Sequence, residues 1–492
     1  MLYDTVIHNG LIVTSSEILP TSTYIGIKDG KISKISNTPL DGDKVINCNG
    51  AHVTPGGIDP HVHLEEPKSI YSDTFQHATK IAIRGGTTTV ISFSLQNDQD
   101  NEENSSIIQD TFEYLENARG NCYCDYGFHL IVRNPTTPLI KSLPKLVELG
   151  LTSCKVYTTY DSMKLTDHQI LTIMLESRKL GITQMIHAEN SDIIQFLNEK
   201  LESKNLLDPY YHAVSRPNEA EDEATYRVIQ LSKIINIPLL IVHMSSKIAL
   251  DHVQNAQNES LPIFAETCPQ YLFLTNNLMK TCHNHSHHHQ IKDSFQGAKY
   301  ICSPPLRDTQ QDLESVWKSL INGTITIFAS DHAPSNYDDL KGKKLGLGDY
   351  KKIPNGLSGV ETRLPLLWSH GVSNQRISPI KFVQLTSTNV AKLYGLDGIK
   401  GDVKVGYDAD LVIWHNEDEL NYELKNEDLG HEFDYTAFEG IKIKNWPKIT
   451  IIRGEVVYKN DEILVEKGYG NFLKRGKSNM TGELRELNPI LS

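Results

Sequence analysis

Cysteine is scarce in this chain and shows no zinc-finger spacing. The seven cysteines are an odd number scattered over 492 residues, a usage typical of reduced thiols in the cytosol. No apolar run reaches the ~18 residues that a membrane helix needs. The N-terminus has neither the basic stretch nor the apolar stretch of a signal peptide. We therefore expect a cytoplasmic protein that makes no membrane contact.

Positive charge is also in short supply. Lys and Arg number 48 against 61 Asp and Glu, which gives a formal net charge of −13. This balance argues against a nucleic-acid partner and against binding to an anionic membrane surface. A hydrophobic content of 39% over 492 residues allows a large core, and the length exceeds that of one simple domain. These features indicate a soluble globular protein of more than one domain.

Both ends of the chain are predicted to form short strands separated by turns. The dipeptides Asn9-Gly10 and Asp29-Gly30 are strong hairpin signals. Strands are predicted at 5–8, 11–14, 24–28 and 31–35, and again at 409–414 and 449–458. Two β-rich ends around a different middle predict one small β domain built from residues 1–54 and 400–465.

The middle of the chain, residues 55–399, alternates strands and helices. Strands are predicted at 57–63, 88–95, 127–132, 153–158, 183–189, 238–243, 262–266 and 324–330, and helices between them include 73–84, 107–118, 166–180 and 221–235. In the helix over 166–180, Thr166 and Gln169 form a capping box, and Gly181 is placed to end it. This alternation predicts an α/β fold, a (β/α)₈ TIM-like barrel rather than a doubly wound sheet.

Histidines stand at the ends of several of these strands. His61 and His63 follow a Pro-Gly-Gly turn, and they point the same way because alternate side chains of a strand share a face. The fifth, sixth and eighth strands end at His187, His243 and Asp331. Any one of these could be a core histidine or a helix cap. Chemistry in such barrels lies at the C-terminal strand ends, however, and imidazoles with a carboxylate there predict a metal site.

Lys155 lies in the fourth strand between Cys154 and Val156. One interpretation is a lysine that simply lies along the strand. The other is an inward-facing amine whose pKa falls on burial. Near a metal, a neutral amine can add carbon dioxide, and the resulting carbamate would bridge two cations as a carboxylate does. The charge balance of a site with two divalent ions favours the second interpretation.

Longer stretches carry a resemblance to a known family. They are Gly-Gly-Ile-Asp-Pro-His-Val-His at 56–63, Gly-Gly-Thr-Thr-Thr at 85–89, Cys-Asp-Tyr-Gly at 124–127, His-Ala-Glu-Asn at 187–190, Ala-Glu-Thr-Cys-Pro-Gln-Tyr at 265–271, Lys-Tyr-Ile-Cys-Ser-Pro-Pro at 299–305 and Glu-Gly-Ile-Lys-Ile-Lys-Asn-Trp-Pro at 439–447. The chain resembles the cyclic amidohydrolases of the dihydropyrimidinase–hydantoinase group over nearly its whole length. Residues 439–447 resemble the fungal dihydropyrimidinases in particular.

The resemblance implies that the β domain of residues 1–54 and 400–465 is a β-sandwich, and it implies a binuclear zinc centre and a homotetramer. One Zn²⁺ would be held by His61, His63 and Asp331, and the other by His187 and His243. Lys155, as N6-carboxylysine, would bridge the two ions.

The resemblance also implies catalytic and substrate-binding residues. Asp331 would move the proton, and Tyr160 matches the tyrosine that hydrogen-bonds the developing oxyanion. Ser303 and Asn355 match positions whose main chain binds the imide edge of the ring. The implied reaction is the hydrolytic opening of 5,6-dihydrouracil to N-carbamoyl-β-alanine, and likewise of dihydrothymine, in pyrimidine catabolism.

Related activities remain open as alternatives. A hydantoinase or an allantoinase would share the metal chemistry, and Ala333 stands where dihydropyrimidinases commonly carry cysteine. Dihydroorotases place an arginine for the substrate carboxylate where this chain has Glu65, so an anionic ring is disfavoured. A non-catalytic scaffold protein of the same group would lose metal ligands, whereas all the ligand positions are present here.

Two further segments have predictions of their own. The C-terminal tail, 466–492, is polar and Gly-rich, but its Tyr469, Phe472 and Leu473 require burial, so we predict that it packs at a subunit interface. The histidine cluster 283–289 lies in a polar insertion between the seventh and eighth strands. We interpret that cluster as a solvated loop.

Overall fold

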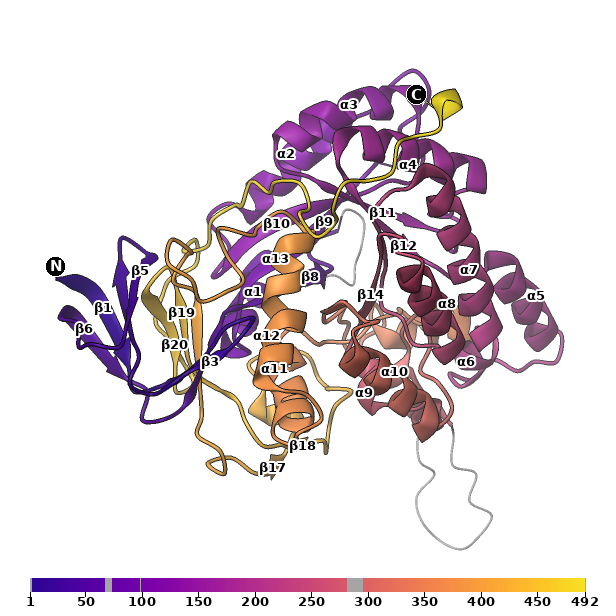
Figure 1. The fold of residues 1–492 in the computed structure, drawn as a ribbon. Coiled ribbons are helices and arrows are strands. Elements are labelled where there is room, and N and C mark those ends of the chain that lie inside the picture. Colours follow the sequence, from indigo (N-terminus) through magenta and orange to yellow (C-terminus); the bar gives the residue numbers. More distant parts are fainter. Residues whose placement is uncertain (1, 67–72, 98, 281–294, 492) are drawn as a thin grey trace, which may run out of the picture.

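A barrel of eight parallel strands forms the centre of the computed structural model, which describes residues 2–66, 73–97, 99–280 and 295–491 (Figure 1). The strands are β8 (Gly57–Val62), β9 (Thr87–Leu95), β10 (Asp125–Ile131), β11 (Ser153–Tyr157), β12 (Thr183–His187), β13 (Leu239–Ile241), β14 (Ile263–Thr267) and β15 (Ile327–Phe328). They are neighbours in sequence order. The ring closes where His63 N–H donates to His332 O at 2.8 Å and His332 N–H donates to His61 O at 3.2 Å. The predicted (β/α)₈ barrel is therefore confirmed.

Helices surround this barrel. They are α1 (Phe75–Arg84), α2 (Ile107–Ala118), α3 (Thr137–Glu148), α4 (Asp167–Leu180), α5 (Ser191–Glu202), α6 (Tyr211–Val214), α7 (Asn218–Ile235), α8 (Lys247–Asn258), α9 (Gln270–Phe273), α10 (Gln310–Asn322), α11 (Arg363–Leu367), α12 (Pro379–Val383) and α13 (Asn389–Leu393). Because helices cover the outer face of the barrel and side chains fill its inside, β8, β10, β11 and β12 are buried along their whole length.

The ends of α4 follow the sequence prediction. The Thr166 side chain accepts the Gln169 N–H, and the Gln169 side chain accepts the Thr166 N–H, which completes the capping box. Gly181 ends the helix with a left-handed φ of 73°, a conformation that glycine adopts without strain. Helix α3 is one of several helices between the strands whose ranges were not predicted individually. Pro144 lies inside it, and proline normally marks a helix boundary.

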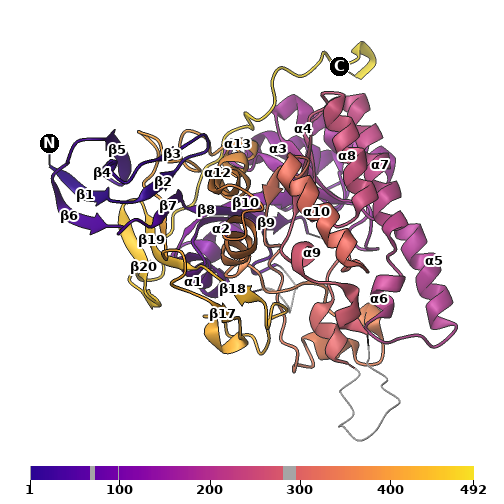
Figure 2. The same cartoon turned by 60° about the horizontal axis from the view of Figure 1, so that its bottom comes forward.

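A second domain is built from both ends of the chain (Figures 1 and 2). One sheet has the order β5-β4-β1-β6, and the other the order β21-β20-β19-β16-β7-β2-β3. Their strands are β1 (Tyr3–His8), β2 (Leu11–Val13), β3 (Ile18–Leu19), β4 (Tyr24–Lys28), β5 (Lys31–Ser36), β6 (Gly42–Asn47), β7 (His52–Pro55), β16 (Leu411–Trp414), β19 (Pro447–Ile452), β20 (Glu455–Lys459) and β21 (Glu462–Ile463). A small two-stranded antiparallel sheet, β17 (Tyr422–Glu423) with β18 (Lys442–Ile443), stands apart from these two sheets.

The two ends meet at β7, which pairs in parallel with β2 and antiparallel with β16. The prediction that both termini build one β domain is thus confirmed. Its residue boundaries, 1–54 and 400–465, stay predictions. A buried ion cluster joins the two domains, because Lys400 Nζ lies 2.8 Å from Asp125 Oδ2 on β10 and 2.6 Å from Asp410 Oδ2 beside β16.

The C-terminal tail crosses the barrel at the N-terminal ends of its strands (Figure 1). Asn471 O accepts the Tyr126 N–H, and the ring of Phe472 lies 5.3 Å from that of Phe128. Arg475 is buried there, with an Nη2–H that donates to Ser153 Oγ at 2.9 Å. The apolar tail residues are therefore packed on their own barrel, and their burial does not require a neighbouring subunit. The placement of 466–492 at a subunit interface stays a prediction.

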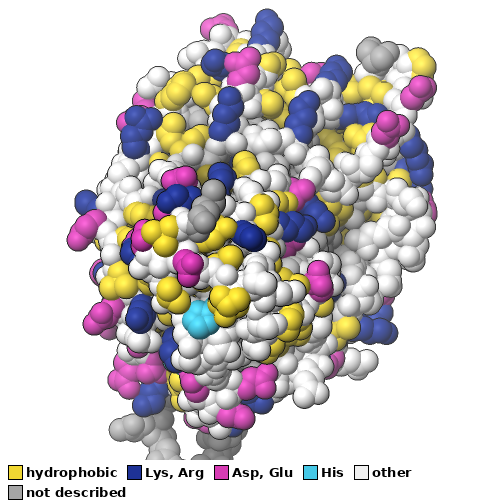
Figure 3. All heavy atoms as spheres, turned by 60° about the vertical axis from the view of Figure 1, so that its left-hand side comes forward, with side chains coloured by type: hydrophobic (Ala, Val, Ile, Leu, Met, Phe, Trp, Pro, Cys, Tyr) yellow, Lys and Arg dark blue, Asp and Glu magenta, His cyan; other side chains and the backbone are white. Residues whose placement is uncertain are grey.

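Charged side chains of both signs are mixed over the surface that carries the terminal strands. On the face drawn in Figure 3, Lys and Arg side chains lie among Asp and Glu side chains. Within the described ranges, no helix is both long and apolar enough to cross a membrane. The predicted histidine loop, 283–289, lies outside the described residues.

Candidate metal centre

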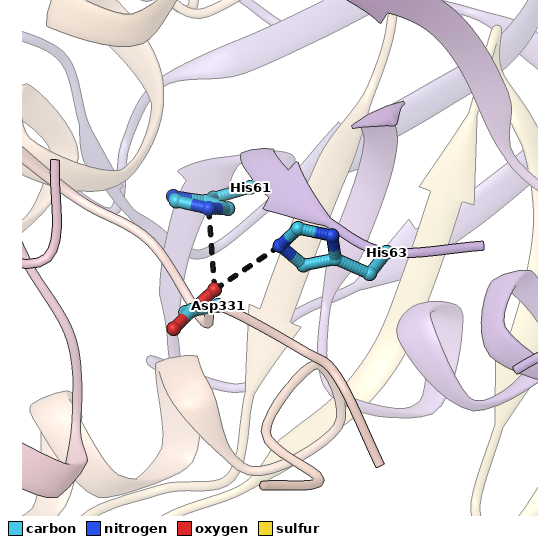
Figure 4. A group of neighbouring side chains, drawn as sticks. All are labelled: His61, His63 and Asp331. Atoms are coloured by element: carbon cyan, nitrogen blue, oxygen red, sulfur yellow. Dashed lines mark ion pairs between the residues drawn. The ribbon is translucent and has the colours of Figure 1, made fainter. Parts of the chain in front are cut away.

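His61, His63 and Asp331 come together at the C-terminal end of the barrel (Figure 4). His61 belongs to β8, His63 follows that strand, and Asp331 follows β15. Asp331 Oδ1 lies 3.2 Å from His61 Nε2 and 3.4 Å from His63 Nε2. All three potential ligand atoms lie within 4.8 Å of one another. The closure of the barrel between β8 and the residues after β15 brings this triangle together.

The outer nitrogens of these two histidines are held by carboxylates. His61 Nδ1 lies 2.6 Å from Glu266 Oε1, and His63 Nδ1 lies 2.5 Å from Glu66 Oε1. These partners place a ring proton on Nδ1, so each inward Nε2 is the atom that a metal ion would bind. The two inward nitrogens and the Asp331 carboxylate oxygen face one another in a buried place, with Lys155 Nζ 2.7 Å from His61 Nε2. A cation between them would satisfy all three, so this donor set fits a metal ion.

A second group of donors lies beside the first. The rings of His187 and His243 have centroids 4.4 Å apart, and those of His61 and His243 lie 5.4 Å apart. His187 Nε2 is 2.7 Å from Glu189 Oε2, which leaves its other nitrogen for a ligand bond. The buried Nδ1 of His243 has no hydrogen-bond partner among the described residues. This orphaned nitrogen fits a second cation.

Lys155 points into this site from β11. Its Nζ lies 2.7 Å from His61 Nε2 and 4.4 Å from the centre of the Phe93 ring. The side chain is 1% exposed. Burial lowers the pKa of Lys155, against the opposing effect of Asp331 and Glu266. The inward-facing interpretation of this lysine is therefore the one that the structure supports.

Neighbouring charges and burial shift the other pKa values in the site. Burial raises the pKa of Glu266, and the neighbouring Lys155 ammonium opposes this shift. For His63 burial acts downward, but Glu66 and Asp331 raise its pKa to about 9. Burial raises the pKa of Asp331, but His61, His63 and His243 outweigh it and bring that pKa well below the usual range. An ionised Asp331 suits both metal binding and proton transfer.

A pocket of about 460 Å³ opens above these groups. Its lining contains nearly all of the predicted site residues, namely His63, Lys155, Tyr160, His187, His243, Ser303, Asp331 and Asn355. His61 lies beneath them, fully buried. Asn355 Nδ2–H reaches the Tyr160 hydroxyl oxygen at 3.5 Å. The structure therefore brings every predicted site residue to one place.

Of the neighbouring residues Glu65 and Glu66, it is Glu66 that lines this pocket. Glu65 Oε1 accepts the Phe75 N–H at 3.2 Å, which fixes its side chain at the start of α1. The expectation that Glu65 meets the substrate is wrong. The backbone explains the difference, because Glu65 has a left-handed φ of 42° and the chain turns between the two residues.

Three site residues have left-handed backbones, with φ of 66° at Tyr160, 40° at His243 and 50° at Asp331. Such conformations are uncommon for residues other than glycine and cluster at functional sites. Each aims a side chain from a strand end into the pocket.

Several buried or half-buried charged residues that support this site were not predicted. They are Glu66, Glu189, Arg216 and Glu266. Arg216 Nη1 lies 2.7 Å from Glu189 Oε2, and its guanidinium lies 5.3 Å from the Tyr160 ring centre. One signal was available in the sequence, since Glu189 and Glu266 both lie at strand ends like the histidines.

Comparisons with known proteins agree with this arrangement. The model of the Amidohydrolase family matches residues 52–457. A D-hydantoinase of Geobacillus stearothermophilus is 38% identical over 479 residues, which cover 96% of this chain and 96% of that protein. A D-hydantoinase of Rhizobium radiobacter is 38% identical over 477 residues, 96% of this chain and 99% of that protein. The crystal structure of a dihydropyrimidinase from Brevibacillus agri has a TM-score of 0.89 at 34% identity, covering 96% of this chain and 99% of that one.

Proposed function

The chain belongs to the amidohydrolase family, and from this membership we propose that it opens the rings of 5,6-dihydropyrimidines by hydrolysis. The observation that carries the proposal is the triangle of His61, His63 and Asp331 beside the buried Lys155, at the floor of a pocket of about 460 Å³. Hydantoins are the second candidate substrates, because the relatives at 38% identity are named D-hydantoinases. A likeness to the fungal dihydropyrimidinases stays a prediction.

We propose that the centre binds two Zn²⁺ ions. His61, His63 and Asp331 would hold one, His187 and His243 the other, and carboxylated Lys155 would bridge them. The bound ions would polarise the ring carbonyl and lower the pKa of water. Support for the carbamate comes from the burial of Lys155, since the lowered pKa favours the neutral amine that carbon dioxide requires.

The side chains of this chain would move the proton and stabilise the developing charge. Water adds to C4, the carbonyl carbon between N3 and C5 of the ring, and the C4–N3 bond breaks. Asp331 would accept the proton of the attacking water and deliver it to the departing nitrogen. Burial raises the pKa of Tyr160, so its hydroxyl stays protonated at neutral pH and can donate to the oxyanion. The product of 5,6-dihydrouracil would be N-carbamoyl-β-alanine.

The charge of the pocket favours a neutral ring. Glu66 is within it and is paired with His63, and its pKa is lowered mainly by that histidine against the effect of burial. A ring that carries a carboxylate would meet this negative charge. We therefore place dihydroorotate below the uncharged dihydropyrimidines as a substrate. Allantoin, which needs polar donors, stays a less favoured alternative.

A turnover panel on the zinc-loaded protein tests the proposal. The substrates are dihydrouracil, hydantoin, allantoin and dihydroorotate, each followed by loss of the ring and appearance of the carbamoyl product. We expect dihydrouracil to give the highest kcat/KM. Turnover of none of the four by a protein that retains two zinc ions would reject the enzyme and favour the scaffold interpretation. A homotetramer in the cytoplasm stays a prediction.

A further inference from the structure

Lys343 is a buried cation outside the metal centre. It begins a 3₁₀ turn at Lys343–Gly346 and has no exposed surface. Its Nζ donates to three main-chain carbonyl oxygens, those of Pro354 at 2.7 Å, Gly356 at 2.8 Å and Ile301 at 3.2 Å. An ammonium group has three N–H donors, so each finds one acceptor.

These carbonyls belong to the two segments that form one wall of the pocket. Ile301 precedes Ser303 by two residues, while Pro354 and Gly356 flank Asn355. Ser303, Pro354, Asn355 and Gly356 all line the pocket. The segments also touch directly, because Gly356 N–H donates to Ile301 O at 3.0 Å. One ammonium group therefore ties together the main chain on both sides of the proposed imide contacts.

The lysine itself is held firmly. Its own N–H donates to Asn336 O at 2.9 Å. At Gly342 a Cβ atom would lie 2.1 Å from the same oxygen, so only glycine allows the chain to approach so closely. On the far side, His212 Nε2–H donates to Cys302 O at 2.9 Å, which fixes the peptide between Ile301 and Ser303. A preorganised support of this kind keeps a binding site within a fraction of an ångström of its productive geometry.

A packing role alone does not account for a lysine here. Burying a charged group is costly unless its hydrogen bonds are satisfied. Burial lowers the pKa of Lys343 to about 7. An apolar side chain would avoid that cost but would leave buried carbonyls without this donor. A lysine at this position therefore lowers stability, but it holds the carbonyl groups of Ile301, Pro354 and Gly356 in a fixed arrangement.

We propose that Lys343 is a positioning residue for substrate binding, which holds the main chain at Ser303 and Asn355 in register with the imide edge of the ring. This inference rests on the proposed function. Contacts to the imide edge exist before and during the reaction, so their loss weakens the binding of substrate and transition state together. Such a loss raises KM and leaves kcat nearly unchanged.

The test is Lys343→Met, which keeps the length of the side chain and removes its donors. We expect KM for the best substrate of the panel to rise about tenfold or more while kcat changes less than about threefold. Zinc content should stay at the wild-type value, since Lys343 contacts no proposed ligand. The matched control is Lys344→Met, which removes a neighbouring, partly exposed lysine that pairs with Asp338 and should leave KM unchanged.

The outcomes separate this inference from the proposed function. An inactive wild-type protein would reject the function itself. An active wild type with an unchanged KM in Lys343→Met would overturn the role of Lys343 and leave the function standing. A fall in kcat with zinc loss would also overturn it, because that pattern assigns Lys343 to the metal centre. If Lys343→Met does not fold, the Lys343→Arg protein tests the role instead, because its planar guanidinium cannot match all three carbonyls. A raised KM in Lys343→Arg supports the positioning role, and a wild-type KM refutes it.

Discussion

Glu266 connects the two halves of the proposed metal centre. Its Oε1 lies 2.6 Å from His61 Nδ1, and it accepts the main-chain N–H of His243 at 3.1 Å. His61 belongs to the first proposed ligand set and His243 to the second. Glu266→Gln keeps the size of the side chain and removes its charge. We expect this change to weaken the binding of both metal ions while the fold is retained.

The size of the effect follows from the contacts that lose charge. A hydrogen bond to a charged group contributes ~1.5–3 kcal/mol. A carboxylate that holds a ligating histidine typically changes metal affinity by ~10–100-fold. At ~1.4 kcal/mol for each tenfold change the two ranges agree. We therefore expect the zinc Kd of the Glu266→Gln protein to rise by ~10–100-fold, with kcat close to normal once zinc is saturating.

Competition with a chelator of known zinc affinity measures this Kd. The control is Glu455→Gln, a half-exposed residue whose Oε2 lies 3.0 Å from Lys44 Nζ. Surface pairs of that kind contribute little, so the control should bind zinc as the wild type does. Equal zinc affinity in the Glu266→Gln and Glu455→Gln proteins would refute the reasoning that Glu266 orients the ligands.

Three more predictions concern catalysis, specificity and the tail. Tyr160→Phe should lower kcat by ~10²–10³-fold with two zinc ions still bound; a change in KM alone would assign Tyr160 to substrate binding. The kcat/KM for dihydrouracil should exceed that for dihydroorotate by at least ~100-fold, or ~2.7 kcal/mol. This ratio should fall in the Glu66→Gln protein. Equal kcat/KM values for the two substrates in the wild type would contradict the charge argument. Phe472→Ala should lower the free energy of unfolding by ~1–2 kcal/mol, because the ring packs on Phe128; an unchanged denaturation midpoint would count against that packing.

The barrel could be predicted because its signals are local. Buried strands such as β12 and helices such as α4 carry their periodicity and caps within a few residues. In helix α3, by contrast, Pro144 lies inside the helix and interrupts the local pattern. The strand predicted at 324–330 is shorter in the structure, Ile327–Phe328, although Thr326 N–H and Ala329 N–H still donate to Ala265 O and Thr267 O of β14.

The metal centre was predictable for a topological reason. Parallel strands of a barrel all end on one face, so His61, His187 and His243 had to converge once the strands were placed. The residues that orient them could not be found in that way. Glu266 is 205 positions from His61, and their hydrogen bond depends on the closed barrel. Lys343 lies in an irregular segment where no periodicity indicates its direction.

The measurement closest to the central claim is the zinc dependence of dihydrouracil ring opening, compared between the wild type and Lys155→Ala. The account predicts that the wild type loses turnover when zinc is removed and regains it when zinc is restored. Lys155→Ala should bind much less zinc and stay inactive, with partial recovery when a short carboxylic acid replaces the missing carbamate. Full turnover by the zinc-free wild type, or by Lys155→Ala, would contradict the account.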